Sequence, residues 1–274
     1  MAEHASHNPK DPAVRANTSN KRMSPAERHS RIQKILQNQG FVTIEYLARQ
    51  FAVTPQTIRR DINVLSKEGL IQRFHGGAGM GSSTENVAYN ERKIMCLEEK
   101  RQIAKMAARQ IPDHVSLFIN IGTTTEAVAR ALSSHRRLTA ITNNLNVANI
   151  LSSNEQFEVI VAGGLLRHRD GGLIGEATID FIRQFRVDYG IIGISGIDVD
   201  GTLLDFDYRE VRAARAIIDN SRKVFLVADH TKFGRNAMVR LGNIEEVHAL
   251  FTDRQPTAPL VDVMARAEVD LFVV

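Results

Sequence analysis

From about residue 115 to its end, this sequence alternates short apolar runs with segments of helical periodicity. The apolar runs lie near residues 115–121, 138–142, 157–162, 188–194, 223–228, 247–251 and 269–274. Strands that are joined by helices run parallel and are covered on both faces, so this alternation predicts an α/β domain with a mostly parallel sheet. Ligands of such domains bind at the carboxyl ends of the strands.

The first 80 residues differ from the rest in charge. They hold twelve Lys and Arg against six Asp and Glu, whereas residues 81–274 hold 23 against 25. Neutralisation of phosphates supplies most of the nonspecific affinity of proteins for DNA. The basic front therefore indicates a separate domain that binds nucleic acid, although a solvated basic surface without a partner would have the same composition.

Helix start and stop signals divide this basic region. Residues 1–23 lack apolar periodicity and are expected to form a disordered arm. Ser24 with Pro25, Thr43, and Thr54 with Pro55 are predicted to begin three helices, with a short strand at 41–42 and a hairpin at 70–78. We therefore expect a winged helix-turn-helix at 24–78, a linker at 79–86, and an α/β sensor and oligomerisation domain at 87–274. A single helix is predicted from Val87 to Gln110.

The third helix, TPQTIRRDINVLSKEG, has the composition of a DNA-reading element. Ile58, Ile62 and Leu65 share its inward face. Arg pairs with guanine and Gln or Asn with adenine through two hydrogen bonds, and Thr contacts a thymine methyl group or a phosphate. The predicted DNA-binding residues, here and in the hairpin, are Thr54, Gln56, Thr57, Arg59, Arg60, Asn63, Arg73 and His75.

These residues are expected to play different roles. Gln56, Thr57 and Arg60 are predicted to read bases because they lie in the first turns, and Arg59 to bind phosphate. Arg59 or Arg60 could instead pair with a carboxylate of the same helix, Asp61 or Glu68. Arg73 and His75 are expected at the minor groove or the backbone, with a purely structural hairpin role open for His75.

The segment FINIGTTTEAVA predicts an anion-binding turn in the second domain. A strand leads into Gly122 and the threonines 123–125, so the peptide N–H groups at a helix start converge with hydroxyl groups. A Gly-Thr start is also an ordinary helix cap. Polar and glycine residues follow other strands in the same way, which favours one shared pocket. The predicted effector-binding residues are Asn120, Gly122, Thr123, Thr124, Thr125, Asn143, Asn144, Gly163, Gly164, Arg167, Ser195, Gly196, Asp229 and Lys232.

Charge assigns roles within this predicted pocket. Lys232 and Arg167 supply positive charge, while Asp229 and Asn144 are suited to the hydroxyl groups of a polyol. Structural alternatives remain open, because Asp229 could line the core or form an ion pair and Arg167 has charged neighbours. Glu210 and Arg212 are expected on a solvated or interface face of a helix.

Two strings at the front, TPQTIRRDINVL and RFHGGAG, resemble the DeoR-type family of bacterial sugar-catabolism repressors. The resemblance continues to residue 274 through FINIGTTTEAVA, AITNNLNVAN, VIVAGGLLRHRDGGLIGEAT, GISGID, LLDFDYREVR and VADHTKFGRNAM, and it is greatest to members that control glycerol catabolism. It implies a repressor that binds double-stranded operator DNA and is released from it by a phosphorylated effector, glycerol-3-phosphate. It also implies a tetramer and a sensor domain of the sugar-phosphate isomerase type.

That resemblance leaves two other functions open. A sugar-phosphate isomerase with a DNA-binding appendage would use carboxylates and a lysine, for which Asp205, Asp207, Asp229 and Lys232 are candidates. The family usually has Asp before Ile-Gly-Thr-Thr, whereas this chain has Asn120, which cannot take up a proton at neutral pH. An activator with the same two domains is the other alternative, because fold does not fix function.

Composition excludes several classes of protein. The single cysteine, Cys96, rules out an internal disulfide framework and a cysteine-built metal cluster, and is expected to pack on a helix face. No metal or cofactor is predicted. The sequence has no apolar run of about 18 residues and no signal-peptide core, so we expect a cytoplasmic protein without a membrane span.

Overall fold

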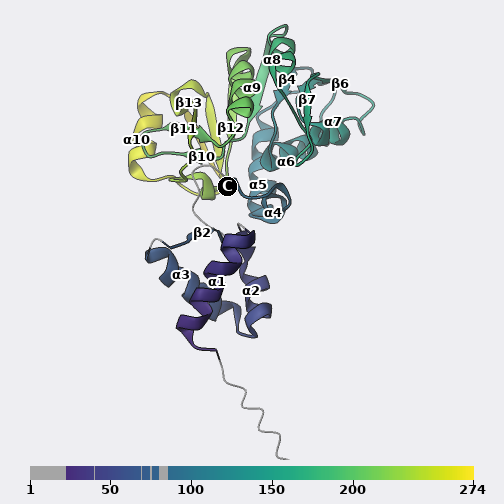
Figure 1. The fold of residues 1–274 in the computed structure, drawn as a ribbon. Helices are drawn as coiled ribbons and strands as arrows, with labels where there is room; N and C mark the ends of the chain where they lie inside the picture. Colours follow the sequence, from purple (N-terminus) through teal and green to yellow (C-terminus); the bar gives the residue numbers. More distant parts are fainter. Residues whose placement is uncertain (1–22, 40, 69, 75, 80–85) are drawn as a thin grey trace, which may run out of the picture.

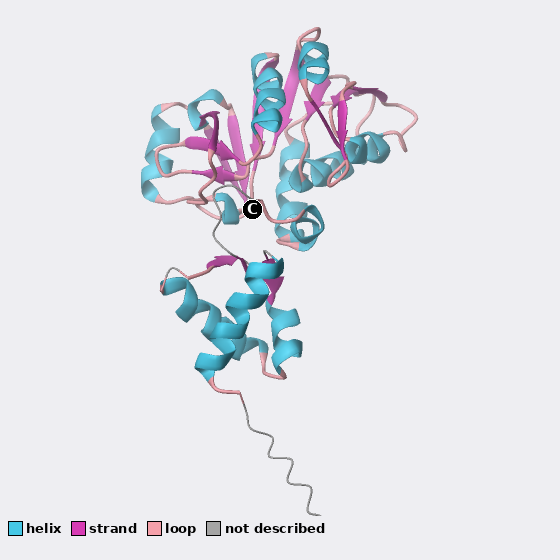
Figure 2. Ribbon diagram, viewed as in Figure 1, coloured by secondary structure: helices cyan, strands magenta, loops and turns pink. Residues whose placement is uncertain are grey.

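The computed structural model describes residues 23–39, 41–68, 70–74, 76–79 and 86–274. They form a small, mainly helical N-terminal domain and a larger α/β domain (Figures 1 and 2). No helix among these residues has both the length and the apolar character needed to cross a bilayer. The expected disordered arm, His75 and most of the expected linker lie outside the described residues.

The N-terminal domain is a winged helix-turn-helix, as predicted. It consists of α1 (Pro25–Gln39), β1 (Phe41–Thr43), α2 (Ile44–Phe51), α3 (Pro55–Lys67), β2 (Gln72–Phe74) and β3 (Gly77–Gly79). The three strands are antiparallel, and β3 lies between β1 and β2. The β2–β3 hairpin forms the wing, and its second strand also pairs with β1.

Side-chain caps explain where these helices begin. Ser24 Oγ accepts a hydrogen bond from Glu27 N at 3.2 Å, and Thr43 Oγ1 accepts one from Tyr46 N at 3.1 Å. Thr54 caps α3 in the same way, with Pro55 at the first helical position. These bonds satisfy peptide N–H groups that have no partner inside a helix. The caps therefore fix the start of α3, on which the predicted DNA contacts depend.

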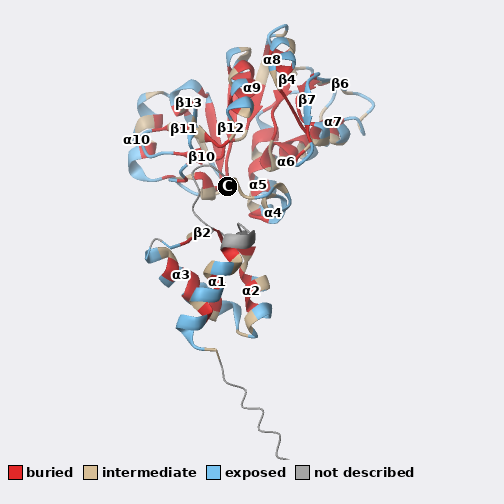
Figure 3. Ribbon diagram, in the orientation of Figure 1, coloured by how far each residue is buried: buried red, intermediate tan, exposed pale blue. Residues whose placement is uncertain are grey.

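The inward faces of the three helices form the core of this domain. Ile58, Ile62 and Leu65 are buried, as their spacing predicts, and pack with Ile32 and Leu47. Each fully buried aliphatic side chain stabilises a domain by about 1.5–3 kcal/mol. This packing holds α3 on the domain with its polar side exposed (Figure 3).

The α/β domain contains the predicted parallel sheet. Its seven strands are arranged in the order β15-β14-β12-β9-β4-β5-β6, and every neighbouring pair is parallel. The strands are β4 (Ser116–Ile119), β5 (Thr139–Thr142), β6 (Glu158–Val161), β9 (Val187–Ile192), β12 (Ser221–Val227), β14 (Ala249–Thr252) and β15 (Asp270–Val273). The chain moves outward from β4 through β6, returns to β9 beside β4, and then moves outward on the other side. The boundary between β4 and β9 is therefore a topological switch point, where α/β sheets bind ligands.

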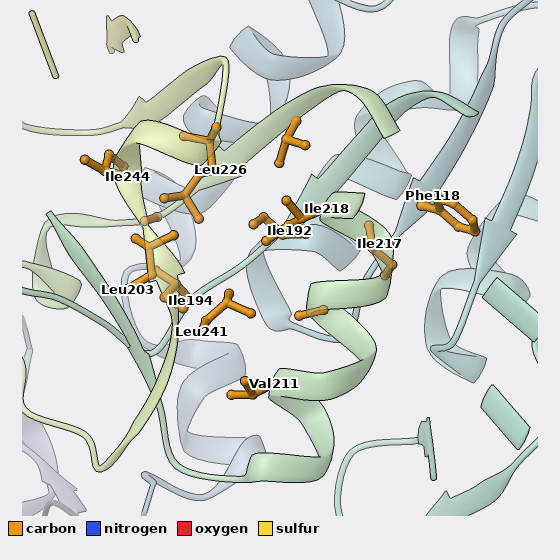
Figure 4. Packing of buried hydrophobic residues seen from close by; sticks show 14 of the residues in the cluster. Phe118, Ile192, Ile194, Leu203, Val211, Ile217, Ile218, Leu226, Leu241 and Ile244 are labelled. Atoms are coloured by element: carbon orange, nitrogen blue, oxygen red, sulfur yellow. The ribbon is translucent and has the colours of Figure 1, made fainter. Parts of the chain in front are cut away.

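Helices cover both faces of the sheet. One apolar cluster joins α5 (Leu97–Arg109), α6 (Thr123–Ala131) and α7 (Leu145–Leu151) to one face. A second cluster joins α8 (Glu176–Ile182), α9 (Tyr208–Asp219) and α10 (Ala258–Arg266) to the other. Figure 4 shows part of this second cluster, in which Ile217 and Ile218 of α9 lie near Ile192 of β9.

The α/β domain also contains short elements that the sequence pattern did not predict. A hairpin pairs β7 (Leu165–Arg167) with β8 (Gly172–Ile174), and β10 (Gly196–Ile197), β11 (Thr202–Asp205) and β13 (Val239–Asn243) form a small antiparallel sheet. The 3-10 turns are η1 (Leu132–Ser134), η2 (His230–Lys232) and η3 (Ile244–Glu246). Each of these strands contains a glycine or a charged residue and lacks the longer apolar run that identifies a buried parallel strand.

The single helix expected from Val87 to Gln110 is wrong. The structure has α4 (Tyr89–Ile94) and α5, separated at Met95 and Cys96. Cys96 has a left-handed backbone with φ 49°, which a continuing right-handed helix cannot contain. Its side chain is buried, as expected for a packing residue. The chain therefore turns a corner where helical periodicity alone predicts a straight segment.

Candidate functional site

The exposed surface of α3 carries the predicted DNA-binding side chains. Gln56, Arg59 and Arg60 are exposed, and Thr57 is half-buried. Thr57 Oγ1 lies 2.9 Å from Thr54 Oγ1, so the cap and the first turn share a hydrogen bond. The surface thus combines hydrogen-bonding groups with two positive charges, which suits the edges of bases and the phosphates beside them.

Asp61 does not pair with the arginines of its own helix. It turns inward, where Arg28 of α1 donates to both of its carboxylate oxygens, at 2.6 and 2.9 Å. His29 Nε2 lies 2.9 Å from Asp61 Oδ1. Within the described part of the chain, Arg59 and Arg60 form no ion pair with Asp61 or Glu68. Both arginines are therefore available to a polyanion, and Asp61 joins α1 to α3.

The wing contacts α3 through two of the predicted residues. Arg73 Nη1 of β2 donates to Asn63 Oδ1 of α3 at 2.8 Å, and both residues are exposed. The structure thus brings Arg73 next to the recognition surface. A pairing between hairpin and helix could not be read from sequence spacing, because it depends on how the wing folds back.

A polar pocket lies where β4, β9 and β12 end in the α/β domain. These strands are neighbours in the sheet, and their following loops supply Gly122, Ser195 and Lys232. The pocket is lined by Arg92, Ile121, Gly122, Thr123, Thr124, Gly193, Ile194, Ser195, Asp205, Glu210, Val227, Lys232 and Arg235. It therefore occupies the switch point of the sheet.

The turn before α6 forms one wall of this pocket. Gly122 is the N-cap residue and makes no side-chain capping bond, and Thr123 and Thr124 follow it into the helix. A Cβ atom at Gly122 would lie 3.2 Å from Thr125 Oγ1. Thr125 is fully buried, and its hydroxyl donates to the carbonyls of Asn120 and Gly122 at 2.7 and 2.8 Å. The turn thus presents peptide N–H groups and two threonines to an anion, while Thr125 holds its shape.

Three cations lie at the same pocket. Burial lowers the pKa of Lys232 to about 8, and Asp229, whose Oδ2 lies 3.8 Å from Lys232 Nζ, opposes that shift. Burial also lowers the pKa of Arg235 to about 10, and its guanidinium lies 4.8 Å from the centre of the Phe206 ring. Arg92 is the third cation. Buried cations of this kind bind anions strongly because little water screens them.

Two carboxylates, Asp205 and Glu210, also line the pocket. Asp205 Oδ1 accepts hydrogen bonds from Ser195 Oγ at 3.0 Å and from Phe206 N at 2.7 Å. Burial raises the pKa of Asp205. Burial, followed by repulsion from Asp205, raises the pKa of Glu210 to about 7. These groups can accept hydrogen bonds from hydroxyls, and Glu210 can also donate one when protonated. The solvated or interface position expected for Glu210 is wrong.

Arg167 lies outside the pocket lining. Its guanidinium binds Asp170 through two hydrogen bonds of 2.8 and 2.7 Å. It also donates to Glu210 at 2.7 Å and to Asp207 at 3.1 Å. Three carboxylates thus surround one arginine, and its charge is compensated inside the protein. Arg212, predicted beside Glu210, is exposed and pairs with Glu176.

The predicted residues near β5 and β6 take part in packing and turns. Asn143 Nδ2 donates to Leu173 O at 3.1 Å, and Asn144 Oδ1 caps α7 through Asn146 N. A Cβ atom at Gly164 would lie 2.0 Å from Thr178 Oγ1, a hydroxyl that donates to Gly163 O. The structure does not bring these four residues to the pocket lining, because β5 and β6 lie on the far side of β4 from β9.

Three further predicted residues do not line the pocket but contact residues that do. Asn120 Oδ1 accepts a hydrogen bond from Ile121 N at 2.7 Å. A Cβ atom at Gly196 would lie 2.1 Å from Arg235 O, so glycine allows that segment to approach. Asp229 is buried, and its interaction with Lys232 and Lys100 outweighs the effect of burial and lowers its pKa to about 2. Asp229 is thus an anion throughout the physiological range.

Sequence reasoning missed two of the three cations. Arg92 comes from α4, more than 20 residues before the predicted turn, and only the corner after α4 brings it to the pocket. Arg235 follows Lys232 by three residues in TKFGRN, so its spacing was a usable signal. Asp205 was considered only as a catalytic carboxylate.

Comparison with known proteins adds independent information on both domains. The model of the DeoR-like helix-turn-helix domain matches residues 28–84, and that of the DeoR C terminal sensor domain matches residues 95–254. The chain is 55% identical over 249 residues to the glycerol-3-phosphate regulon repressor of Escherichia coli (strain K12), covering 91% of this chain and 99% of that protein. The repressor of the same name in Haemophilus influenzae is 53% identical over 234 residues, covering 85% and 91%.

Solved structures resemble the chain less closely. Ribose 5 phosphate isomerase A from Neisseria gonorrhoeae matches with 16% identity and a TM-score of 0.36, covering 49% of this chain and 52% of that one. The eIF2B delta structure from Chaetomium thermophilum has 12% identity and a TM-score of 0.46, covering 85% and 73%. Likenesses of this degree do not specify a site. The matched domain models and the curated relatives do establish the family: the chain belongs to the DeoR family, and carries its helix-turn-helix domain followed by its sensor domain.

Proposed function

We propose that this chain is a transcriptional repressor that binds operator DNA through α3 and releases it when glycerol-3-phosphate occupies the pocket. The observation that carries the proposal is one pocket lined by an anion-binding helix start, by cations and by carboxylates. Glycerol-3-phosphate has a phosphate dianion at one end and two hydroxyls at the other, so it offers groups to both kinds of partner. The curated relatives cited above carry the name of the same regulon.

The phosphate is assigned to the turn before α6. There the N–H groups of the first turn, the hydroxyls of Thr123 and Thr124, and the ammonium of Lys232 are directed to one region. The glycerol hydroxyls are assigned to Asp205 and Glu210 of the same lining. Carboxylate oxygens accept hydrogen bonds from hydroxyl donors such as those of the glycerol group, which inorganic phosphate lacks.

DNA is assigned to the polar surface of α3. Gln56, Thr57 and Arg60 are proposed to contact base edges, and Arg59 to contact phosphate, with Asn63 and Arg73 beside them. His75 remains a proposed contact to the minor groove or the backbone. Two copies related by a two-fold axis would read half-sites about 34 Å apart or a multiple of it. We therefore also propose a palindromic operator and an even-numbered assembly, for which the family resemblance suggests a tetramer. Such a protein acts where the chromosome is, in the cytoplasm.

The proposal is tested by binding measurements on the full chain. Fluorescence anisotropy with a labelled promoter fragment should show tight binding that glycerol-3-phosphate weakens and that glycerol or inorganic phosphate does not. Calorimetry should show that glycerol-3-phosphate binds the protein without DNA. A coupled isomerase assay with a panel of sugar phosphates addresses the enzymatic alternative, and turnover without any DNA response would refute the proposed function.

A further inference from the structure

A corner in the chain lies between the pocket and the N-terminal domain. We define the corner as residues 89–100, which comprise α4, the turn at Met95 and Cys96, and the first turn of α5. On one side Arg92 lines the pocket. On the other side the corner faces the N-terminal domain across a hollow lined by Thr43, Glu45, Gly76, Ile94, Met95, Cys96, Leu97 and Glu99. Figure 1 shows α4 at the end of the α/β domain nearest to α1 and α2.

Lys100 holds the corner in its bent form. Its side chain is buried, and Nζ donates to Arg92 O at 2.5 Å and to Met95 O at 2.7 Å. The last carbonyls of a helix have no partner within it, and a cation near them is favourable. Burial of an ammonium is costly unless hydrogen bonds compensate it, so the position of Lys100 depends on α4. The residue therefore ties α4 to α5.

The corner is also tied to the anion-binding turn. Tyr89 OH of α4 donates to Glu126 Oε1 of α6 at 2.8 Å, and Asn146 Nδ2 lies 3.0 Å from the same hydroxyl. Glu126 is buried in the first turn of α6, the helix that begins at the anion-binding turn. Arg92 Nε donates to Val87 O at 3.1 Å. A short helix held at both ends by such bonds moves as one unit.

From this geometry we infer that the corner couples the pocket to the N-terminal domain, and that Lys100 is the positioning residue that keeps Arg92 on α4 at the pocket. The inference rests on the function proposed above. An anion in the pocket attracts Arg92, and because Lys100 fixes the end of α4, a shift of Arg92 also shifts Ile94 and Leu97. These side chains face the N-terminal domain across the hollow, so a small movement of the corner changes the position of that domain relative to the α/β domain.

The first test compares two substitutions of lysine on the same helix. Lys100→Met removes the buried ammonium, and Lys105→Met removes an exposed one as a matched control. Operator dissociation constants are measured by anisotropy with and without glycerol-3-phosphate, and effector binding by calorimetry. The quantity compared is the ratio of the operator dissociation constant with glycerol-3-phosphate to that without it. For the wild-type protein this ratio should be about 5 to 150, the usual range for coupled sites. We expect Lys105→Met to keep that ratio, and Lys100→Met to lower it at least fivefold while still binding the operator.

A second variant protects the test against misfolding of Lys100→Met. Ile94 is 60% exposed, so Ile94→Asp should leave the core intact while placing a carboxylate near Glu45 and Glu99. Val199→Asp, at a residue 52% exposed in the loop before β11, is its control. We expect Ile94→Asp to change the ratio at least fivefold and Val199→Asp to leave it unchanged.

The outcomes separate this inference from the proposed function. If folded Lys100→Met and Ile94→Asp both release the operator with the wild-type ratio, the corner does not couple the two sites and the inference is overturned. If Lys100→Met does not fold, Ile94→Asp alone decides. Wild-type protein that ignores glycerol-3-phosphate would instead refute the proposed function, and the inference with it.

Discussion

Lys232 Nζ lies 3.8 Å from Asp229 Oδ2, and both side chains are buried where Lys232 lines the pocket at the ends of β4, β9 and β12. Burial lowers the pKa of Lys232 to about 8, while Asp229, with a pKa of about 2, remains an anion and opposes that shift. The ammonium is therefore close to losing its proton just above neutral pH. A phosphate bound beside it would favour the charged form.

Effector binding should weaken as the pH rises. The protonated form of Lys232 predominates below pH 8 and is lost above it, so the dissociation constant of glycerol-3-phosphate should increase about tenfold between pH 7 and pH 9. Calorimetry across this range measures the effect. Lys232→Arg keeps its charge and should show a flatter profile, and equal profiles for both proteins would exclude Lys232 as the cause.

Removing anion contacts should abolish the response while preserving DNA binding. Lys232→Ala and Thr124→Val each delete a group assigned to the phosphate, so we expect at least tenfold weaker effector binding and an operator affinity within about threefold of wild type. Lys223→Ala, at an exposed lysine of β12, is the control. Anisotropy titrations measure both quantities. A normal response in both variants would place the effector elsewhere.

The two exposed arginines of α3 should differ in effect. Arg60→Ala should relax base preference at one operator position, at a cost of about 1–3 kcal/mol, because a bidentate base contact is lost. Arg59→Ala should weaken binding to all sequences and lower the salt dependence by about one phosphate contact. Competition with a set of single-base operator variants at several salt concentrations measures these effects. Unchanged preference and unchanged salt slope in both variants would contradict the assignment.

The buried pair of Arg28 and Asp61 should stabilise the N-terminal domain as a unit. Asp61→Ala leaves the guanidinium of Arg28 buried without its partner and should lower stability by about 3–5 kcal/mol. Hydrogen exchange of the α1 and α3 amides in the full chain measures the change. Glu68→Ala, at the exposed C-cap residue of α3, should have little effect. Similar protection in both variants would show that the pair contributes little.

The parts of the structure that follow from local rules could be predicted from the sequence. Apolar runs identified all seven parallel strands, and caps such as Thr54 fixed the start of α3, because burial and capping act over a few residues. The anion-binding turn at Gly122 was also predictable, since it lies directly between a strand and a helix.

The remaining features depend on contacts between distant residues. Arg92 reaches the pocket only because Cys96 adopts a left-handed backbone and Lys100 bends the chain back onto α4. Arg167 seemed available for a ligand, but Asp207 and Glu210, about 40 residues later, compensate its charge. No spacing rule joins residues so far apart, and side-chain pairing decides which cations face the pocket.

The most direct test of the account measures the affinity of the full chain for its promoter fragment with and without saturating glycerol-3-phosphate, at constant ionic strength. The account predicts a dissociation constant at least about fivefold larger with the effector, equivalent to about 1 kcal/mol of coupling, and an equal weakening of effector binding by the DNA. Identical affinities in the two conditions would contradict it.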